Sequence, residues 1–100
     1  MDRLDALWAW GREFLGCRYA ILGGAMTWVS AHGLVAAISN AGGFGVLATG
    51  SMSPEQLDAE IAATQDATDK PFGVNIILMH PQLAELTDVC TRRGVGHVVL

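Results

Sequence analysis

Tyr19-Ala20-Ile21-Leu22-Gly23-Gly24-Ala25-Met26-Thr27-Trp28-Val29-Ser30 is the stretch of sequence that decides the fold. Its apolar start predicts a short buried strand that stops at Gly23-Gly24, and Ser30 is predicted to be the N-cap of the following helix. A strand–loop–helix unit places its loop at the carboxyl end of the strand, where α/β folds bind their ligands. The small residues leave backbone N–H groups accessible to a flat ring. The alternative is that the two glycines only form the turn.

The composition limits the class of protein. The chain has 100 residues, 51% of them hydrophobic, and a formal net charge of −4. It is therefore not disordered, and one small domain or part of a larger one is expected. No apolar run reaches the ~18 residues of a membrane span. No cluster of Lys and Arg is present to attract nucleic acid or an anionic membrane.

The cysteines and histidines predict no metal site. Cys17 and Cys90 lie far apart in the sequence, which is typical of reduced thiols, and we expect a cytoplasmic protein. No two histidines have the spacing of metal ligands. His32 and His97 are interpreted as structural or solvated. His80 follows a predicted strand and could line a site, although a loop residue before Pro81 is the simpler interpretation.

The rest of the chain alternates between predicted helices and strands. The predicted helices cover residues 2–15, 31–41, 53–68 and 80–94, and the predicted strands after the first cover residues 44–48, 72–79 and 96–100. Ser53, Pro54 and Gln56 carry the signature of a capping box with proline at the first helical position. The apolar residues expected to face inward are Leu4, Leu7, Trp8, Phe14 and Leu15 in the first helix, Leu34, Ala37, Ile38 and Ala41 in the second, Leu57 and Ile61 in the third, and Leu83, Leu86, Val89 and Cys90 in the fourth.

This order indicates an α/β fold with a parallel sheet. A helix comes first, then three βα units, then a fourth strand. The spacing of the strands is compatible with the ~31 residues per unit of a (β/α)₈ barrel and equally with an open doubly wound sheet. The predicted fourth strand would leave an uncovered edge, so we expect the N-terminal part of something longer or a truncated protein.

Asn75 is the residue most suggestive of a site within the strands. Asparagine is depleted in strands, yet Asn75 lies between Val74 and three apolar residues. If it is buried, its amide needs hydrogen-bond partners. These partners are either backbone groups or a polar ligand at the carboxyl end of the strand, where Gly73 would leave room.

Three segments carry a family resemblance. They are residues 21–30, residues 36–45 (Ala-Ala-Ile-Ser-Asn-Ala-Gly-Gly-Phe-Gly) and residues 68–75 (Thr-Asp-Lys-Pro-Phe-Gly-Val-Asn). In sequence and order they resemble the nitronate monooxygenase family, formerly called 2-nitropropane dioxygenase, to which the type II enoyl-acyl-carrier-protein reductase is closely related. The resemblance covers residues 19–100.

The resemblance implies a (β/α)₈ TIM barrel that binds FMN at its C-terminal mouth. Residues 1–100 would then be a single domain, the first half of that flavin-binding barrel, with residues 1–18 forming a helix before the first strand. The residues implied to touch the cofactor are Gly24, Ala25, Met26, Thr27 and Asn75. The catalytic histidine and the FMN-phosphate segments of the family match nothing in this sequence.

The function implied is oxidation of alkyl nitronates with oxygen through the flavin, incomplete in this chain. One alternative is an FMN- and NAD(P)H-dependent reductase of enoyl thioesters. Another is a non-catalytic half-barrel, which could hide its edge as a homo-oligomer, or a truncated remnant. The expected partners are small-molecule substrates, with neither nucleic acid nor membrane.

Overall fold

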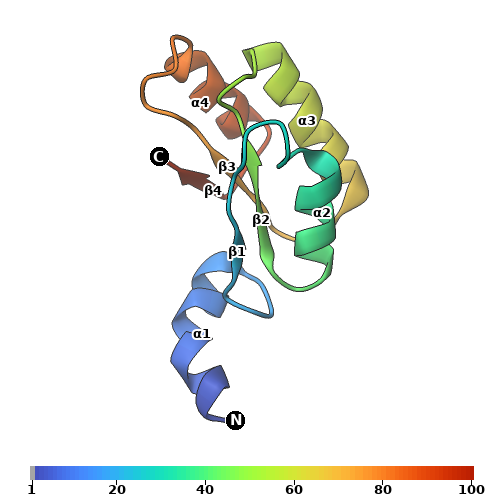
Figure 1. The fold of residues 1–100 in the computed structure, drawn as a ribbon, viewed down its shortest axis with the longest axis vertical. Helices are drawn as coiled ribbons and strands as arrows, with labels where there is room; N and C mark the ends of the chain where they lie inside the picture. Colours follow the sequence, from blue (N-terminus) through green and yellow to red (C-terminus); the bar gives the residue numbers. More distant parts are fainter. Residues whose placement is uncertain (1) are drawn as a thin grey trace.

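The structure, a computed structural model, describes residues 2–100 and contains four helices and four strands in that part of the chain (Figure 1). In chain order they are α1 (Arg3–Leu15), β1 (Leu22–Gly23), α2 (His32–Asn40), β2 (Phe44–Ala48), α3 (Pro54–Ala67), β3 (Gly73–Asn75), α4 (Leu83–Arg92) and β4 (His97–Val99). The alternation of helices and strands predicted from the sequence is confirmed.

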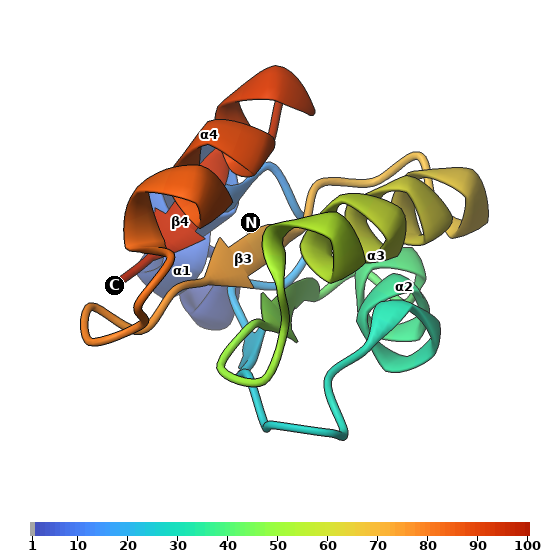
Figure 2. The same cartoon turned by 90° about the horizontal axis from the view of Figure 1, so that it is seen from above.

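The four strands form one parallel sheet in the order β1-β2-β3-β4. Neighbours in sequence are neighbours in space, with Gly23 opposite Gly45 and Ala48 opposite Asn75. Figure 2 shows α2, α3 and α4 along one side of this curved sheet, while the other side carries no such layer of helices. Because all strands run in one direction, their carboxyl ends lie at one edge.

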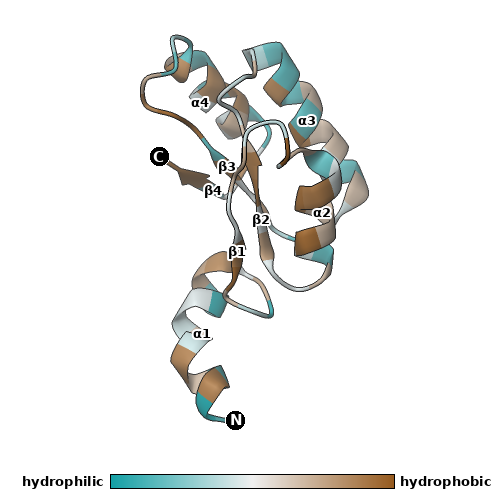
Figure 3. Cartoon of the chain, viewed as in Figure 1, coloured by the Kyte–Doolittle hydropathy of each residue, from teal (hydrophilic) through white to brown (hydrophobic). Residues whose placement is uncertain are grey.

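The core lies between the sheet and the three covering helices. Its buried members are Val35, Leu47, Leu57, Ile61, Phe72, Val74, Ile76, Leu86, Val89 and Cys90. The inward faces predicted for α3 and α4 are confirmed by the burial of Leu57, Ile61, Leu86, Val89 and Cys90 and the partial burial of Leu83. Figure 3 shows β2 and β4 in the hydrophobic colour, while α3 carries hydrophilic residues.

The capping box predicted at the start of α3 is present. The Ser53 hydroxyl accepts from the Gln56 N–H at 3.2 Å, and the Gln56 side chain accepts from the Ser53 N–H at 2.8 Å. Pro54 occupies the first helical turn, where its missing N–H costs nothing.

The inward face predicted for α1 is wrong for most of its residues. Of the five, Leu15 is buried, Trp8 is partly buried, and Leu4, Leu7 and Phe14 are exposed. The reason is the position of the helix, which extends beyond the sheet and meets it chiefly through its last turn (Figure 1). There the Phe14 carbonyl accepts from Nε2 of His97 in β4 at 2.7 Å, and the two rings pack edge to face.

The inward face predicted for α2 is correct at Ile38, which is half-buried against Gly23 of β1, but wrong for the other three residues. The residues buried are Val35, Ala36 and Ser39, whereas Leu34 and Ala37 are exposed. The cause is Gly45 in β2, because a Cβ at that position would lie 2.5 Å from the Val35 carbonyl oxygen. The helix therefore packs its Val35 turn against a strand that has no side chain there.

The strands around the predicted site are shorter than expected. β1 contains only Leu22 and Gly23, and Ile21 and Leu22 are half exposed because β1 has a hydrogen-bonded neighbour only in β2 within the described residues. β3 ends at Asn75 rather than residue 79, since residues 77–80 form a turn closed by the His80 N–H on the Ile77 carbonyl. α4 begins at Leu83, beyond this turn.

No helix in residues 2–100 combines the length and the apolar character needed to cross a bilayer.

A bidentate ion pair joins α3 to the end of α4 and makes stability depend on pH. Arg93 donates to both carboxylate oxygens of Asp58, at 2.8 and 3.0 Å, and these hydrogen bonds lower the pKa of Asp58. A carboxyl group whose pKa is lowered by folding stabilises the fold above its unfolded pKa of about 3.9 and loses that contribution as pH falls through the folded value.

We therefore expect Asp58→Asn to lower the thermal midpoint at neutral pH, with the difference from the unmodified chain vanishing below about pH 3. Thermal unfolding followed by circular dichroism between pH 2 and 7 measures this. Asp69→Asn, which removes an exposed carboxylate of the same charge, is the matched control and should give no such pH-dependent difference. A difference for Asp58→Asn that is constant across the range would contradict the ion-pair explanation.

Candidate functional site

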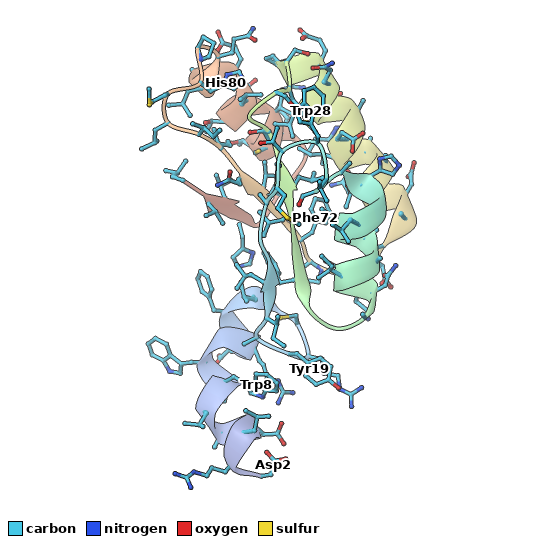
Figure 4. The ribbon with its side chains drawn as sticks, viewed as in Figure 1. Asp2, Trp8, Tyr19, Trp28, Phe72 and His80 are labelled. Atoms are coloured by element: carbon cyan, nitrogen blue, oxygen red, sulfur yellow. The ribbon has the colours of Figure 1, made fainter. Side chains whose placement is uncertain are left out.

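The loops that follow β1, β2 and β3 meet at the carboxyl edge of the sheet. Gly50, in the β2–α3 loop, is the point of closest approach. A Cβ there would lie 2.8 Å from Cδ1 of Ile77 in the β3–α4 loop and 3.6 Å from Oγ1 of Thr27 in the β1–α2 loop. Figure 4 shows Trp28 and His80 at this end of the molecule and Asp2, Trp8 and Tyr19 at the other. Glycine at position 50 thus lets three loops close on one another.

Ser30 shapes the β1–α2 loop from inside. Its side chain is buried, and its hydroxyl accepts from the Met26 N–H at 2.8 Å and donates to the Gly24 carbonyl at 3.2 Å. The prediction that Ser30 caps α2 is therefore wrong, since Ala31 is the N-cap residue and makes no side-chain bond. The hydroxyl is occupied by its own loop, four and six residues back along the chain.

This folding of the loop leaves backbone donors free. The Met26 carbonyl accepts from the N–H groups of both Val29 and Ser30, which closes the turn. Within residues 2–100 the N–H groups of Ala25 and Thr27 have no protein acceptor. Met26 and Thr27 have exposed side chains, and nothing lies within 4 Å of a Cβ built on Gly24. The loop therefore offers accessible donors at the edge of the sheet.

Asn75 lies at the same edge, at the end of β3, and only one of the two polar atoms of its side-chain amide has a hydrogen-bond partner. Its Nδ2 donates to the Val99 carbonyl of β4 at 3.1 Å, while its own backbone carbonyl accepts from the Thr49 hydroxyl at 2.7 Å. In the described part of the chain, Oδ1 has no hydrogen-bond donor. The interpretation of Asn75 as a structural amide therefore holds for its nitrogen, while a ligand contact at its oxygen stays a prediction.

Ser30 and Thr49 are the site residues that the sequence analysis did not identify. Thr49 is fully buried and follows β2 directly. A hydroxyl residue immediately after a buried strand is the signal that could have found it, because such a group must bond to neighbouring backbone. Ser30 gave a signal as well, which was interpreted as a helix cap.

The three histidines hold structural positions. His80 accepts from the Gln82 N–H at Nδ1 and donates from Nε2 to the Met52 carbonyl, both at 3.0 Å, so it ties the β3–α4 loop to the β2–α3 loop. His32 bonds to Glu60, and His97 to Phe14. Residues 2–100 hold no group of three His, Cys, Asp or Glu side chains that could bind a metal.

The thiols are poor nucleophiles. Burial raises the pKa of Cys17, whose Sγ donates to the Tyr19 carbonyl, and burial alone raises the pKa of Cys90. Raised pKa values keep both groups protonated at neutral pH.

A hollow of about 540 Å³ near Phe14, Phe72 and His97 lies at the amino end of the sheet, away from the loops described above.

Taken together, the carboxyl edge offers two free backbone donors and one free amide acceptor, and both ring nitrogens of the nearby His80 are already bonded. This set suits the polar rim of a flat neutral heterocycle, which presents both donors and acceptors, and residues 2–100 bring no cluster of metal-ligating side chains to it.

Comparison with known proteins identifies a family for the chain. Residues 11–96 match the sequence model of the family described as nitronate monooxygenase. The chain is 37% identical to a (3aS,4S,5R,7aS)-5-hydroxy-7a-methyl-1-oxo-octahydro-1H-indene-4-carboxyl-CoA dehydrogenase of Mycobacterium tuberculosis, over 83% of this chain and 23% of that protein. It is 39% identical to a nitronate monooxygenase of Pseudomonas aeruginosa, over 73% of this chain and 21% of that protein.

A solved structure shows the same fold. FabK from Thermotoga maritima superposes with a TM-score of 0.82 at 42% sequence identity, over 84% of this chain and 27% of that one. The predicted fold class is thereby confirmed, because the four parallel strands and their helices match the N-terminal part of that barrel. The chain spans only 21% to 27% of the length of these three relatives.

The role of Ser30 in shaping the loop can be tested by Ser30→Ala. We expect the bonded amide protons of Met26, Val29 and Ser30 to exchange with solvent about 10-fold faster, because the Met26 N–H loses its acceptor and the turn loosens. Hydrogen exchange followed by NMR measures this residue by residue. Ser51→Ala, an exposed serine in the neighbouring loop, should leave that exchange unchanged. Equal exchange in the unmodified chain and in Ser30→Ala would show that the loop holds its shape without the hydroxyl.

Proposed function

Because the chain belongs to the nitronate monooxygenase family, we propose that it is the first part of a flavin-dependent oxidoreductase and supplies one side of an FMN site. The family resemblance suggests the cofactor, and the free hydrogen-bonding groups at the carboxyl edge of the sheet support this place for it. The observation that carries the proposal is the coincidence of free backbone donors in the β1–α2 loop and a free acceptor on Asn75 at one edge of the sheet.

In this proposal the ring of FMN lies against residues 24–27. The N–H groups of Ala25 and Thr27 would donate hydrogen bonds to the flavin, and Oδ1 of Asn75 would accept one from it. Gly24 leaves space for the ring, because no atom lies within 4 Å of where its Cβ would be. The half-exposed Met26 side chain is free to pack on the ring face.

Bound FMN would supply the electron transfer, and the residues of this chain bind and orient it. Each described histidine ring is already bonded within the fold, so we assign no acid–base residue here. The reaction that the family resemblance favours is oxidation of an alkyl nitronate by oxygen. In this proposal residues 1–100 act as one structural unit of a cytoplasmic enzyme whose partners are small-molecule substrates.

A second candidate is a flavin-dependent oxidoreductase that acts on an acyl thioester. Two observations favour it: the relative named a carboxyl-CoA dehydrogenase is 37% identical, and the structure of FabK is 42% identical. Both candidates use the same ring site. Assays of the protein with an alkyl nitronate and oxygen, and separately with NAD(P)H and an enoyl thioester, distinguish them.

A half-barrel that assembles without catalysis is a third possibility, which the mass of the chain in solution tests. A dimer that binds no flavin would favour it.

The proposed role of Asn75 is tested by Asn75→Ala. We expect the dissociation constant for FMN to rise about 10-fold or more, because a buried ligand contact is lost and its partner on the ring is left unpaired. Quenching of flavin fluorescence on titration measures the constant.

The matched control is Asn40→Ala. It also removes a partly bonded amide, but one that binds Ala67 and Thr68 at the far end of α2. This variant should bind FMN as the unmodified chain does. Equal FMN affinities for the unmodified chain and Asn75→Ala would remove Asn75 from the proposed site.

A further inference from the structure

A second hollow lies between the β1–α2 loop and α3, and the proposed flavin edge does not use it. Its volume is about 300 Å³, and its walls include Trp28, Ala48, Met52, Gln56, Ala59 and Glu60. Its lining includes neither residues 24–27 nor Asn75. We refer to it as the Trp28–Glu60 pocket.

Trp28 stands at this pocket in an unusual conformation. It is the one non-glycine residue with positive φ, 70°, in the described part of the chain, and its side chain is 85% exposed. A bulky residue rarely adopts this backbone region, and such outliers persist where the surroundings determine them. Here the bonds from the Val29 and Ser30 N–H groups to the Met26 carbonyl fix the turn. The result is a large aromatic face presented to solvent beside a hollow.

Glu60 places a negative charge in the same pocket. Its side chain is one quarter exposed, and its carboxylate accepts from the His32 backbone N–H at 2.9 Å and from His32 Nδ1 at 3.0 Å. His32 Nδ1 also lies 3.2 Å from the other carboxylate oxygen, Oε1. These contacts fix the carboxylate, and each oxygen keeps a lone pair for a further donor. No Lys or Arg of residues 2–100 lies within ion-pair distance of it.

We propose that the Trp28–Glu60 pocket binds a small organic cation, an ammonium group attached to a compact apolar body. An indole face and a carboxylate are the two groups that attract an ammonium ion in proteins. The apolar body packs on Ala48, Met52 and Ala59, which leave room because two of the three are alanine. The inference does not depend on flavin binding, since no residue of the proposed flavin edge takes part.

The probe is benzylammonium, titrated into the 100-residue chain and followed by ¹H–¹⁵N NMR. We expect saturable shifts at the Trp28 indole N–H and at the amides of the first two turns of α3. Benzyl alcohol, which has the same apolar body without the charge, should bind about 5-fold more weakly or worse. Absence of saturation, or equal binding of benzyl alcohol, would overturn the proposal.

Matched variants separate the two recognition groups. Glu60→Gln keeps an acceptor for the His32 N–H and removes the charge, so benzylammonium should bind about 5-fold more weakly while benzyl alcohol binds as before. Trp28→Leu should weaken benzylammonium about 2- to 5-fold. The controls are Glu55→Gln on the same helix and Trp10→Leu, an equally exposed tryptophan on α1.

If Glu55→Gln and Trp10→Leu weaken benzylammonium binding as much as Glu60→Gln and Trp28→Leu do, the pocket is not the binding site. Ala59→Leu gives an independent check, because it fills the pocket from α3 while Trp28 and Glu60 are both retained, and it should abolish binding of benzylammonium. Unchanged binding in Ala59→Leu would place the probe elsewhere. Failure of FMN to bind the same chain has no bearing on these results, so the two proposals fail separately.

Discussion

A short series of polar contacts across the carboxyl edge of the sheet holds the rest of the structure in place. The Thr49 hydroxyl at the end of β2 bonds to the Asn75 carbonyl of β3, and the Asn75 amide bonds in turn to the Val99 carbonyl of β4. Thr49 is fully buried and Asn75 is half-buried, and polar groups removed from water are costly unless paired, so each fixes the position of its neighbour. Because the strands end in register, the loops that follow them also meet, and Asn75 Oδ1 is held at the surface they share.

Close approach at glycine residues also determines how the loops and the flanking helices pack. Gly50 admits Ile77 and Thr27 at distances that a side chain would forbid, and Gly45 admits Val35 of α2 in the same way. Ser30 folds the β1–α2 loop back on itself, which frees backbone N–H groups on one side and turns Trp28 outward on the other. One loop therefore contributes to two different surfaces, the proposed flavin edge and the Trp28–Glu60 pocket.

The sequence predicted what depends on local pattern. The alternation of elements, the capping box at Ser53 and the buried faces of α3 and α4 follow from neighbours in the chain, and all are confirmed. The faces of α1 and α2 were wrong for most of their residues, because the glycine in β2 and the contact with His97 decide which residues face the sheet. These contacts join residues far apart in the sequence. Asn75 was identified because asparagine is unusual in a strand. Thr49 was not, because its role depends on which carbonyl lies opposite it. The cofactor roles of residues 24–27 and of Asn75 stay predictions.

The measurement that tests the central claim most directly is an NMR titration of the ¹⁵N-labelled chain with FMN, with lumiflavin as a second ligand that has the ring without the phosphate. The account predicts shifts at the amides of Gly24, Ala25 and Thr27 and at the Asn75 side-chain amide, the same for both ligands. Shifts confined to the amino end of the sheet, around Phe72 and His97, or an absence of shifts with both ligands, would contradict it.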